Sequence, residues 1–223
     1  CGKKPATKEL KYTLNDDGKS YTVTGINQYV ADIVVAAEYN GKPVTGIDQS
    51  AFKEKTTITS VYIPDSVTTI GDYAFSGCSN LTSITIPDSV TTIGSHAFFC
   101  CSALESVTIG NGVTTIGDYA FDGCSSLQYN EYDNACYLGN AGNPYVVLIK
   151  AKDTSITSCT INSNTKLIYY SAFRDCSALT SITIPDSVTT IGNYAFYGCS
   201  AFTSITIPDG VTTIGDYAFD GCS

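Results

Sequence analysis

The sequence predicts an α/β solenoid, in which stacked 23-residue coils each contribute one strand to a parallel sheet. Three observations predict this fold class. An Ala-Phe dipeptide recurs with a period of 23, a stretch of alternating Ile and Thr precedes it, and turn-forming Pro-Asp and Gly residues separate the two. The repeated dipeptides are Ala51-Phe52, Ala74-Phe75, Ala97-Phe98, Ala120-Phe121, Ala172-Phe173, Ala195-Phe196 and Ala218-Phe219.

The first half of each repeat has the pattern of a short strand. In one repeat the apolar side chains of Leu81, Ile84 and Ile86 alternate with those of Ser83 and Thr85. A two-residue period of β-branched side chains indicates a strand with one buried face. A Pro-Asp pair then ends the strand, because proline cannot donate to a ladder and aspartate favours turns.

The second half of the repeat returns the chain to the next strand. Val90 and Ile93 place a second short extended stretch against the core, and Gly94 turns the chain. We expect Ala97-Phe98 to close the coil with a turn or a short helix. One coil by itself buries too little apolar surface to offset the entropy lost when its residues are ordered. Stacked neighbours must therefore supply much of the difference.

One irregular region interrupts the repeats. The spacing from Leu127 to Ile156 is 29 residues, which is one repeat plus six. Two apolar runs, at 135–138 and 145–149, flank a turn rich in Gly and Asn, which predicts a β-hairpin insert. The sequence therefore divides into regular repeats at 44–126 and 156–223 and an irregular repeat at 127–155.

Residues 10–43 have the pattern of an N-terminal β cap. Apolar alternation at 12–14 and 21–23 flanks Asn15-Asp16-Asp17-Gly18, which is a strong hairpin signal. Such a segment would cover the hydrophobic end of the first coil. No comparable segment follows the last coil, so we expect that end to meet further chain or to associate end to end with another molecule.

Composition restricts the partners. The net charge of -9 and the pI near 4.4 argue against nucleic acid, because phosphate binding needs clustered Lys and Arg. They also argue against direct adsorption to an anionic membrane. No apolar run approaches the roughly 20 residues of a membrane-spanning helix.

The N-terminal residues resemble those of a bacterial lipoprotein cleaved at its lipobox. The chain begins Cys1-Gly2-Lys3-Lys4, and residues 1–9 form a polar segment. In lipoproteins the N-terminal Cys carries the lipid and a polar tether follows it. The resemblance implies lipid attachment at Cys1 and an extracellular, cell-surface location. The alternative is that the boundary falls on a Cys by chance.

Six cysteines occupy one column of the repeat: Cys78, Cys101, Cys124, Cys176, Cys199 and Cys222. Neighbours in such a column lie about 4.8 Å apart, and parallel side chains give poor disulfide geometry. We predict a buried ladder of reduced thiols that bond to carbonyls at the turn. Zinc is not expected, because no paired ligands or His cluster accompany the cysteines, and no cofactor is expected either.

Other chemistry-bearing residues fit repeat positions better than an active site. His96, the single histidine, occupies the column of Tyr73, Tyr119, Tyr194 and Tyr217. No nucleophile is paired with a base, which argues against an enzyme. Asp65, Asp88, Asp186 and Asp209 form an acidic column that we interpret as strand terminators, with weak calcium binding as the alternative.

The unit Leu-Thr-Ser-Ile-Thr-Ile-Pro-Asp-Ser-Val-Thr-Thr-Ile-Gly-Asp-Tyr-Ala-Phe resembles the BspA-type (Treponema-type) leucine-rich repeat over roughly residues 44–223, apart from the insert. The resemblance implies a right-handed, curved leucine-rich-repeat solenoid on a bacterial surface. It also implies adhesion to host or matrix proteins and to other microbes. The motif is structural, so no ligand residue can be carried over from the family.

Two sets of residues are candidates for a protein-binding surface. The outward strand column offers many hydroxyls but little anchor area, whereas binding hot spots favour Tyr, Trp and Arg. The first set is Tyr62, Thr85, Thr108, Thr160, Thr183 and Thr206. The second set, which we expect to supply the better anchors, is Tyr73, Tyr119, Tyr194 and Tyr217 with the insert tyrosines Tyr132, Tyr137 and Tyr145.

Three functions compete on this evidence. A non-enzymatic adhesion module that binds proteins is the hypothesis we favour. The regular Ser and Thr arrays alternatively suggest a lattice that binds polysaccharide or ice, although a curved sheet cannot match an extended lattice. A purely structural surface protein is a further alternative, and a hydrolase has no supporting set of residues.

Overall fold

The computed structural model describes residues 5–222. The chain divides into two compact units, Cys1–Gln128 and Tyr129–Ser223, which we call unit 1 and unit 2 and describe separately. Cys1, the predicted site of lipid attachment, lies outside the described residues. Within residues 5–222 no helix could cross a membrane.

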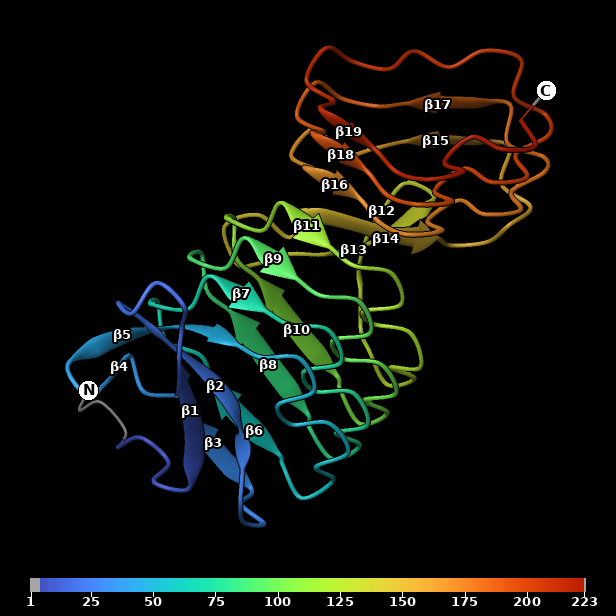
Figure 1. The fold of residues 1–223 in the computed structure, drawn as a ribbon. Helices are drawn as coiled ribbons and strands as arrows, with labels where there is room; N and C mark the ends of the chain where they lie inside the picture. The colour runs from blue at the N-terminus through green and yellow to red at the C-terminus, as the bar shows by residue number, and fades with distance from the viewer. Residues whose placement is uncertain (1–4, 223) are drawn as a thin grey trace. The chain divides into compact units, whose positions relative to one another are not determined.

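Unit 1 stacks its strands into two sheets, which Figure 1 shows on different sides of the same coils. One sheet has the order β1-β2-β5-β7-β9-β11, with β4 paired to β5, and the other has the order β10-β8-β6-β3. The strands are β1 (Leu10–Leu14), β2 (Tyr21–Ile26), β3 (Asp32–Val34), β4 (Glu38–Tyr39), β5 (Lys42–Ile47), β6 (Ser60–Tyr62), β7 (Thr69–Ile70), β8 (Ser83–Ile86), β9 (Thr92–Ile93), β10 (Ser106–Ile109) and β11 (Thr115–Ile116).

The regular coils contribute to two parallel sheets, except that the coil of β19 joins only one of them, so the expectation of a single sheet was incomplete. The predicted strand appears as β8 and β10, paired in register with Ser83 opposite Ser106. The second extended stretch is also a strand: Thr92 and Ile93 of β9 pair with Thr115 and Ile116 of β11. The curvature and the right-handed twist implied by the family resemblance stay predictions.

The N-terminal hairpin is confirmed, and it belongs to the solenoid. Strands β1 and β2 pair antiparallel around the Asn15–Ser20 turn. Strand β2 then pairs in parallel with β5, and β3 pairs in parallel with β6. Val23 of β2 and Ile33 of β3 are fully buried. Residues 10–43 therefore form an incomplete coil whose outer edge is closed by the antiparallel strand β1.

Unit 2 begins with the predicted insert and continues with regular coils. Strands β13 and β14 form the expected antiparallel hairpin, and β12 pairs with the other edge of β13. Strand β14 pairs in parallel with β16 of the next coil. One sheet has the order β12-β13-β14-β16-β18-β19, and β15 pairs with β17 apart from it (Figure 1). The strands are β12 (Asn130–Tyr132), β13 (Ala135–Leu138), β14 (Val147–Ala151), β15 (Ser158–Thr160), β16 (Leu167–Ile168), β17 (Ser181–Thr183), β18 (Thr190–Ile191) and β19 (Thr213–Ile214).

The α/β assignment was wrong, because the Ala-Phe segment forms no helix and residues 5–222 contain only strands and turns. Its amides do not donate four residues back along the chain. Instead Phe75 N donates to Ala97 O at 2.7 Å in the next coil, whereas Ala74 N donates to Gly71 O at 3.3 Å. A positive φ of 56° at Tyr73 produces this alternation between neighbouring and local acceptors. The turn is thus a third ladder between coils, and a helix would break it.

Inward side chains stack in columns through the coils. Phe75 lies between Phe52 and Phe98, with ring centroids 5.1 and 5.3 Å apart, and all three rings are fully buried. Phe173 and Phe196 repeat the arrangement in unit 2 at 5.3 Å. Each buried aromatic side chain contributes about 1.5–3 kcal/mol of transfer free energy. The predicted continuous core is therefore present within each unit.

Replacing Gly94 with Ala tests how closely the coils approach. A Cβ atom at Gly94 would meet the Asp72 backbone nitrogen at 2.5 Å, so the two coils must separate. We expect Gly94→Ala to destabilise the protein by about 1–3 kcal/mol, as other overpacking substitutions do. Thermal unfolding followed by circular dichroism measures the effect. The matched control is Gly142→Ala, where the nearest atom is 3.4 Å away. Equal melting temperatures for the two variants would contradict the packing argument.

Candidate functional site

The outward column of the strands, which we call the strand-face column, lies on the surface as predicted. Tyr62 is 55% exposed and Thr85 is exposed, whereas Thr108 is half-buried. Parallel pairing holds Thr85 directly opposite Thr108 in β8 and β10. In unit 2, Thr160 lies opposite Thr183, and the exposed Thr206 follows in a segment outside any strand. The column presents hydroxyls and one large ring, so it can offer hydrogen bonds but little apolar area beyond Tyr62.

Aromatic side chains form a second exposed column, which we call the ring column. In unit 1, His96 stacks between Tyr73 at 4.6 Å and Tyr119 at 5.0 Å. In unit 2, Tyr194 stacks on Tyr217 at 5.2 Å with an interplanar angle of 15°. Tyr119 is 39% exposed and Tyr217 is 61% exposed, whereas the other three rings are half-buried. The predicted tyrosines are therefore brought together into one stacked array in each unit.

The ring column depends on an unusual backbone conformation. Each of its residues has a positive φ, with values from 54° at Tyr217 to 58° at Tyr119. Bulky residues rarely adopt this left-handed region, which costs roughly 1–2 kcal/mol per residue. The inter-coil hydrogen bonds of the turn fix the conformation in every coil. Each Cα–Cβ bond of the column consequently points in the same direction relative to its coil.

The insert tyrosines do not all reach the surface, and Tyr137 must be removed from the candidate anchors. Its side chain is fully buried, and its hydroxyl accepts a hydrogen bond from Asn162 N at 3.4 Å. Strand β13 lies between β12 and β14, and all four of its residues are buried. Burial also raises the pKa of Tyr137 well above its usual value. Tyr145 is half-buried against Tyr137, whereas Tyr132 is 39% exposed.

The column cysteines line the core as free thiols. Cys78 Sγ donates to Phe52 O at 3.2 Å, Cys101 Sγ to Phe75 O at 3.1 Å, and the same contact recurs at later coils. Burial raises the pKa of Cys78, Cys124 and Cys199 to about 12. These thiols stay protonated near neutral pH, so they act as donors to turn carbonyls rather than as nucleophiles.

In the exposed acidic column, Asp88 stabilises a turn. Asp88 Oδ1 accepts a hydrogen bond from Asn111 N at 2.6 Å, one repeat further on. Asp65, Asp186 and Asp209 are also exposed. Within residues 5–222, no group of three His, Cys, Asp or Glu side chains is arranged to hold a metal ion. The interpretation of this column as strand terminators agrees with the Asp88 contact.

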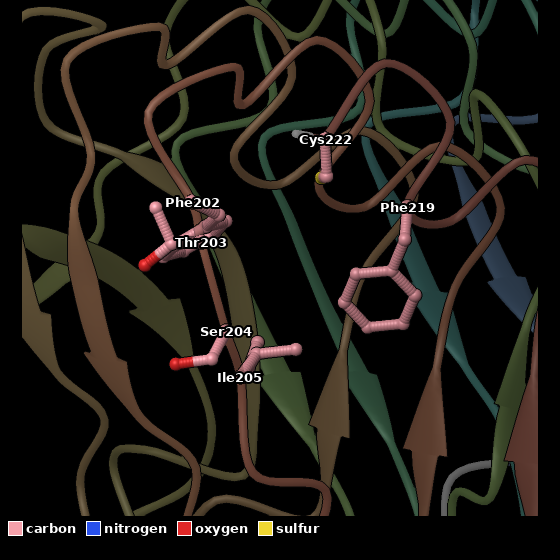
Figure 2. A pocket seen from close by; sticks show the side chains of 6 residues that line it. All are labelled: Phe202, Thr203, Ser204, Ile205, Phe219 and Cys222. Carbon is pink, nitrogen blue, oxygen red and sulfur yellow. The ribbon is translucent and has the colours of Figure 1, made fainter.

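A cavity of about 110 Å³ lies in the last coil of unit 2, between Thr203–Ile205 and Phe219. Figure 2 shows Ile205 pointing toward Phe219, whereas the Thr203 and Ser204 hydroxyls point away from it. Phe219 stacks on Phe196 at 5.2 Å, and Cys222 Sγ donates to Phe196 O at 3.3 Å. The apolar part of the lining thus comes from the core columns, and Thr203 and Ser204 add only exposed hydroxyls, so the lining has no group suited to acid–base chemistry. End-to-end association through this region stays a prediction.

These features define a parallel β-solenoid with a leucine-rich-repeat core, a class that typically serves as a non-enzymatic binding scaffold. The family model described as the BspA type leucine rich repeat region matches residues 45–140 and 151–223 in six copies. The chain belongs to this family of bacterial repeat proteins.

Solved structures agree with this family. A leucine-rich repeat protein of T. pallidum is 26% identical, with a TM-score of 0.62 over 99% of this chain and 89% of that protein. A leucine-rich cell surface protein of Faecalibacterium prausnitzii is 31% identical, with a TM-score of 0.58 over 98% of this chain. The chain spans 52% of the length of the latter protein. No curated protein sequence matches the chain.

Alkaline pH is expected to destabilise the core through its thiols. Their pKa values in the folded chain, about 12 at Cys78 and Cys124, exceed the 9.0 of an unburied thiol. The contribution of these neutral thiols to the free energy of unfolding is therefore fully present below pH 9. It is lost as the pH rises toward 12, because the thiols of the unfolded chain release their protons first. Melting temperatures measured in reductant from pH 7 to 11 should fall above pH 9. A Cys78→Ala/Cys124→Ala variant should show a smaller fall, and an equal fall in both proteins would refute the assignment.

Proposed function

We propose that this protein is a bacterial cell-surface scaffold that binds other proteins, including host or matrix proteins, through its ring columns. The observation that carries the proposal is the stacked array of partly exposed rings in each unit, with Tyr119 39% and Tyr217 61% exposed. The F. prausnitzii relative is described as a cell surface protein, which supports the location. The lipid anchor at Cys1 stays part of the proposal, and the mass of the native N-terminal peptide tests it.

The ring column suits protein recognition better than the strand-face column does. Tyrosine buries a large area and loses little side-chain freedom, so it is enriched among the residues that dominate interfaces. Here the cost of ordering the rings is met during folding, because the turn and the neighbouring ring fix each side chain. The strand-face column offers short hydroxyl side chains, which provide hydrogen bonds but little apolar area.

The alternative of a hydroxyl lattice for polysaccharide or ice has less support. Just before strands β7 and β9, threonine hydroxyls already donate to the coil before them: Thr68 Oγ1 to Thr45 O at 3.1 Å and Thr91 Oγ1 to Thr68 O at 3.3 Å. Thr189 and Thr212 repeat the contact in unit 2. Hydroxyls that stabilise the stack offer fewer groups to an external lattice.

Replacing the exposed rings should weaken protein capture. We expect Tyr119→Leu/Tyr217→Leu to weaken binding to a captured host or matrix protein at least tenfold, since such anchors contribute roughly 2 kcal/mol or more each. Pull-down from host fluids identifies the protein, and surface plasmon resonance measures its affinity. Circular dichroism checks that the variant folds.

The control variant Thr85→Ala/Thr183→Ala changes only the strand-face column and should bind within about twofold of the parent chain. Loss of binding in this control, with the ring variant unaffected, would move the site to the strands. Failure of the folded parent chain to retain any protein would refute the proposed function and favour a purely structural role.

A further inference from the structure

The repeats carry carboxylates and almost no cations. Between residues 56 and 128 of unit 1 there is no Lys or Arg, and after Arg174 in unit 2 there is none either. The acidic residues of these two stretches are Asp65, Asp72, Asp88, Glu105, Asp118 and Asp122 in unit 1, and Asp175, Asp186, Asp209, Asp216 and Asp220 in unit 2. A partner with complementary charge is therefore cationic, and electrostatic complementarity governs both specificity and association rate.

Unit 2 already contains one arginine bound to its ring column. The Arg174 guanidinium carbon lies 5.7 Å from the Tyr194 ring centroid and 5.1 Å from that of Tyr197. Its Nε atom lies 3.5 Å from Asp175 Oδ2. Two aromatic rings and a carboxylate thus surround one guanidinium, which is the environment that arginine prefers at interfaces.

Unit 1 shows the same relation at its first regular coil. Lys53 Nζ lies 5.2 Å from the Tyr73 ring centroid. Lys53 and Arg174 occupy equivalent positions, each one residue after an Ala-Phe pair. The equivalent position in the later coils holds Ser76, Phe99 and Asp122. Only the first coil of each unit therefore brings its own cation to the column.

The position after Phe contacts the ring column in further coils. Phe99 contacts the His96 ring at 5.3 Å, and Tyr197 contacts the Tyr194 ring at 5.7 Å. Asp122 follows the same turn, because its amide donates to Tyr119 O at 3.1 Å just as the Phe99 amide donates to His96 O at 3.1 Å. Asp122 therefore has the same backbone relation to Tyr119 as Phe99 has to His96, and both Asp122 and Tyr119 are exposed.

We propose that the ring columns with their flanking carboxylates bind arginine side chains of a partner protein. The surface in unit 1, which we call the arginine strip, consists of His96, Phe99, Tyr119 and Asp122, because Lys53 already lies over the Tyr73 ring. This inference rests on the proposed function and names the chemistry of the partner: a segment rich in arginine. Arg174 occupies the corresponding surface of unit 2 from within the chain.

The probe is a fluorescein-labelled ten-residue peptide of alternating Arg and Ser, followed by fluorescence anisotropy with the full chain at physiological salt. We expect the Arg peptide to bind more tightly than its Lys counterpart, because a guanidinium stacks on rings and pairs bidentately with carboxylate. The counterpart with Gln in place of Arg should not bind. Equal binding of the Gln peptide would overturn the inference.

Variants separate the arginine strip from general charge attraction. Tyr119→Leu and Asp122→Asn should each weaken binding of the Arg peptide about threefold or more. Glu105→Gln removes an exposed carboxylate away from the strip and should change binding less than twofold. An effect of Glu105→Gln equal to that of Asp122→Asn would show attraction without a site.

A gain of binding provides the sharpest test. Arg174→Ala removes the internal occupant and should strengthen Arg-peptide binding about threefold through unit 2, and adding Tyr194→Leu should abolish that gain. Lys11→Ala removes an exposed positive charge elsewhere in the chain and should have no such effect. Identical results for Arg174→Ala and Lys11→Ala would overturn the inference.

The proposed function and this inference can fail separately. If the chain captures proteins and excess Arg peptide does not displace them, proteins bind elsewhere, so the inference fails and the proposed function stands. If the peptide binds as expected and displaces the captured protein, both are supported. If no protein is captured, the proposed function fails, whatever the peptide shows.

Discussion

The structure depends on backbone hydrogen bonds between residues one repeat apart. They connect neighbouring coils at two places. Beside strand β9, Thr91 N donates to Thr68 O at 2.9 Å, and in the turn that holds the Ala-Phe pair, Phe75 N donates to Ala97 O at 2.7 Å. Because buried amides and carbonyls must be paired, the regular coils stack on neighbours of the same length, and the irregular repeat joins the stack through its hairpin. A strict 23-residue register follows, and it places like residues on one another. The phenylalanine, thiol and ring columns are consequences of this one constraint.

The same constraint explains why the surface is both regular and rigid. Tyr73, His96 and Tyr119 share a positive φ near 57° because the ladder through the turn requires it at that position. An isolated chain would avoid this conformation, which costs free energy in every coil. The stacked rings and the inter-coil hydrogen bonds compensate for that cost. An aromatic array assembled in this way needs no further ordering when a partner binds.

Variation among the repeats is concentrated at a few surface positions. The inward residues of successive coils are nearly identical, whereas the position after Phe changes from Lys53 to Ser76, Phe99 and Asp122 in unit 1. An inward substitution would disturb the packing of both neighbouring coils, whereas a substitution at this position leaves the ladder intact. Charge and ring area can therefore differ from coil to coil, and binding specificity can be set there without loss of stability.

The sequence by itself determined the period, the inward columns, the insert hairpin and the N-terminal hairpin, because each depends on local hydrophobic alternation and turn residues. Its Thr-Ile dipeptides, such as Thr92-Ile93, were a signal for the second sheet, but two residues are too few to identify a strand. Only the tertiary structure decided that the Ala-Phe segment forms a turn hydrogen-bonded to its neighbours rather than a helix, since the acceptors of the Phe amides lie in the next coil. It also decided that Tyr137 is buried while Tyr119 is exposed, because burial depends on the strands that pack on either side and not on residue type.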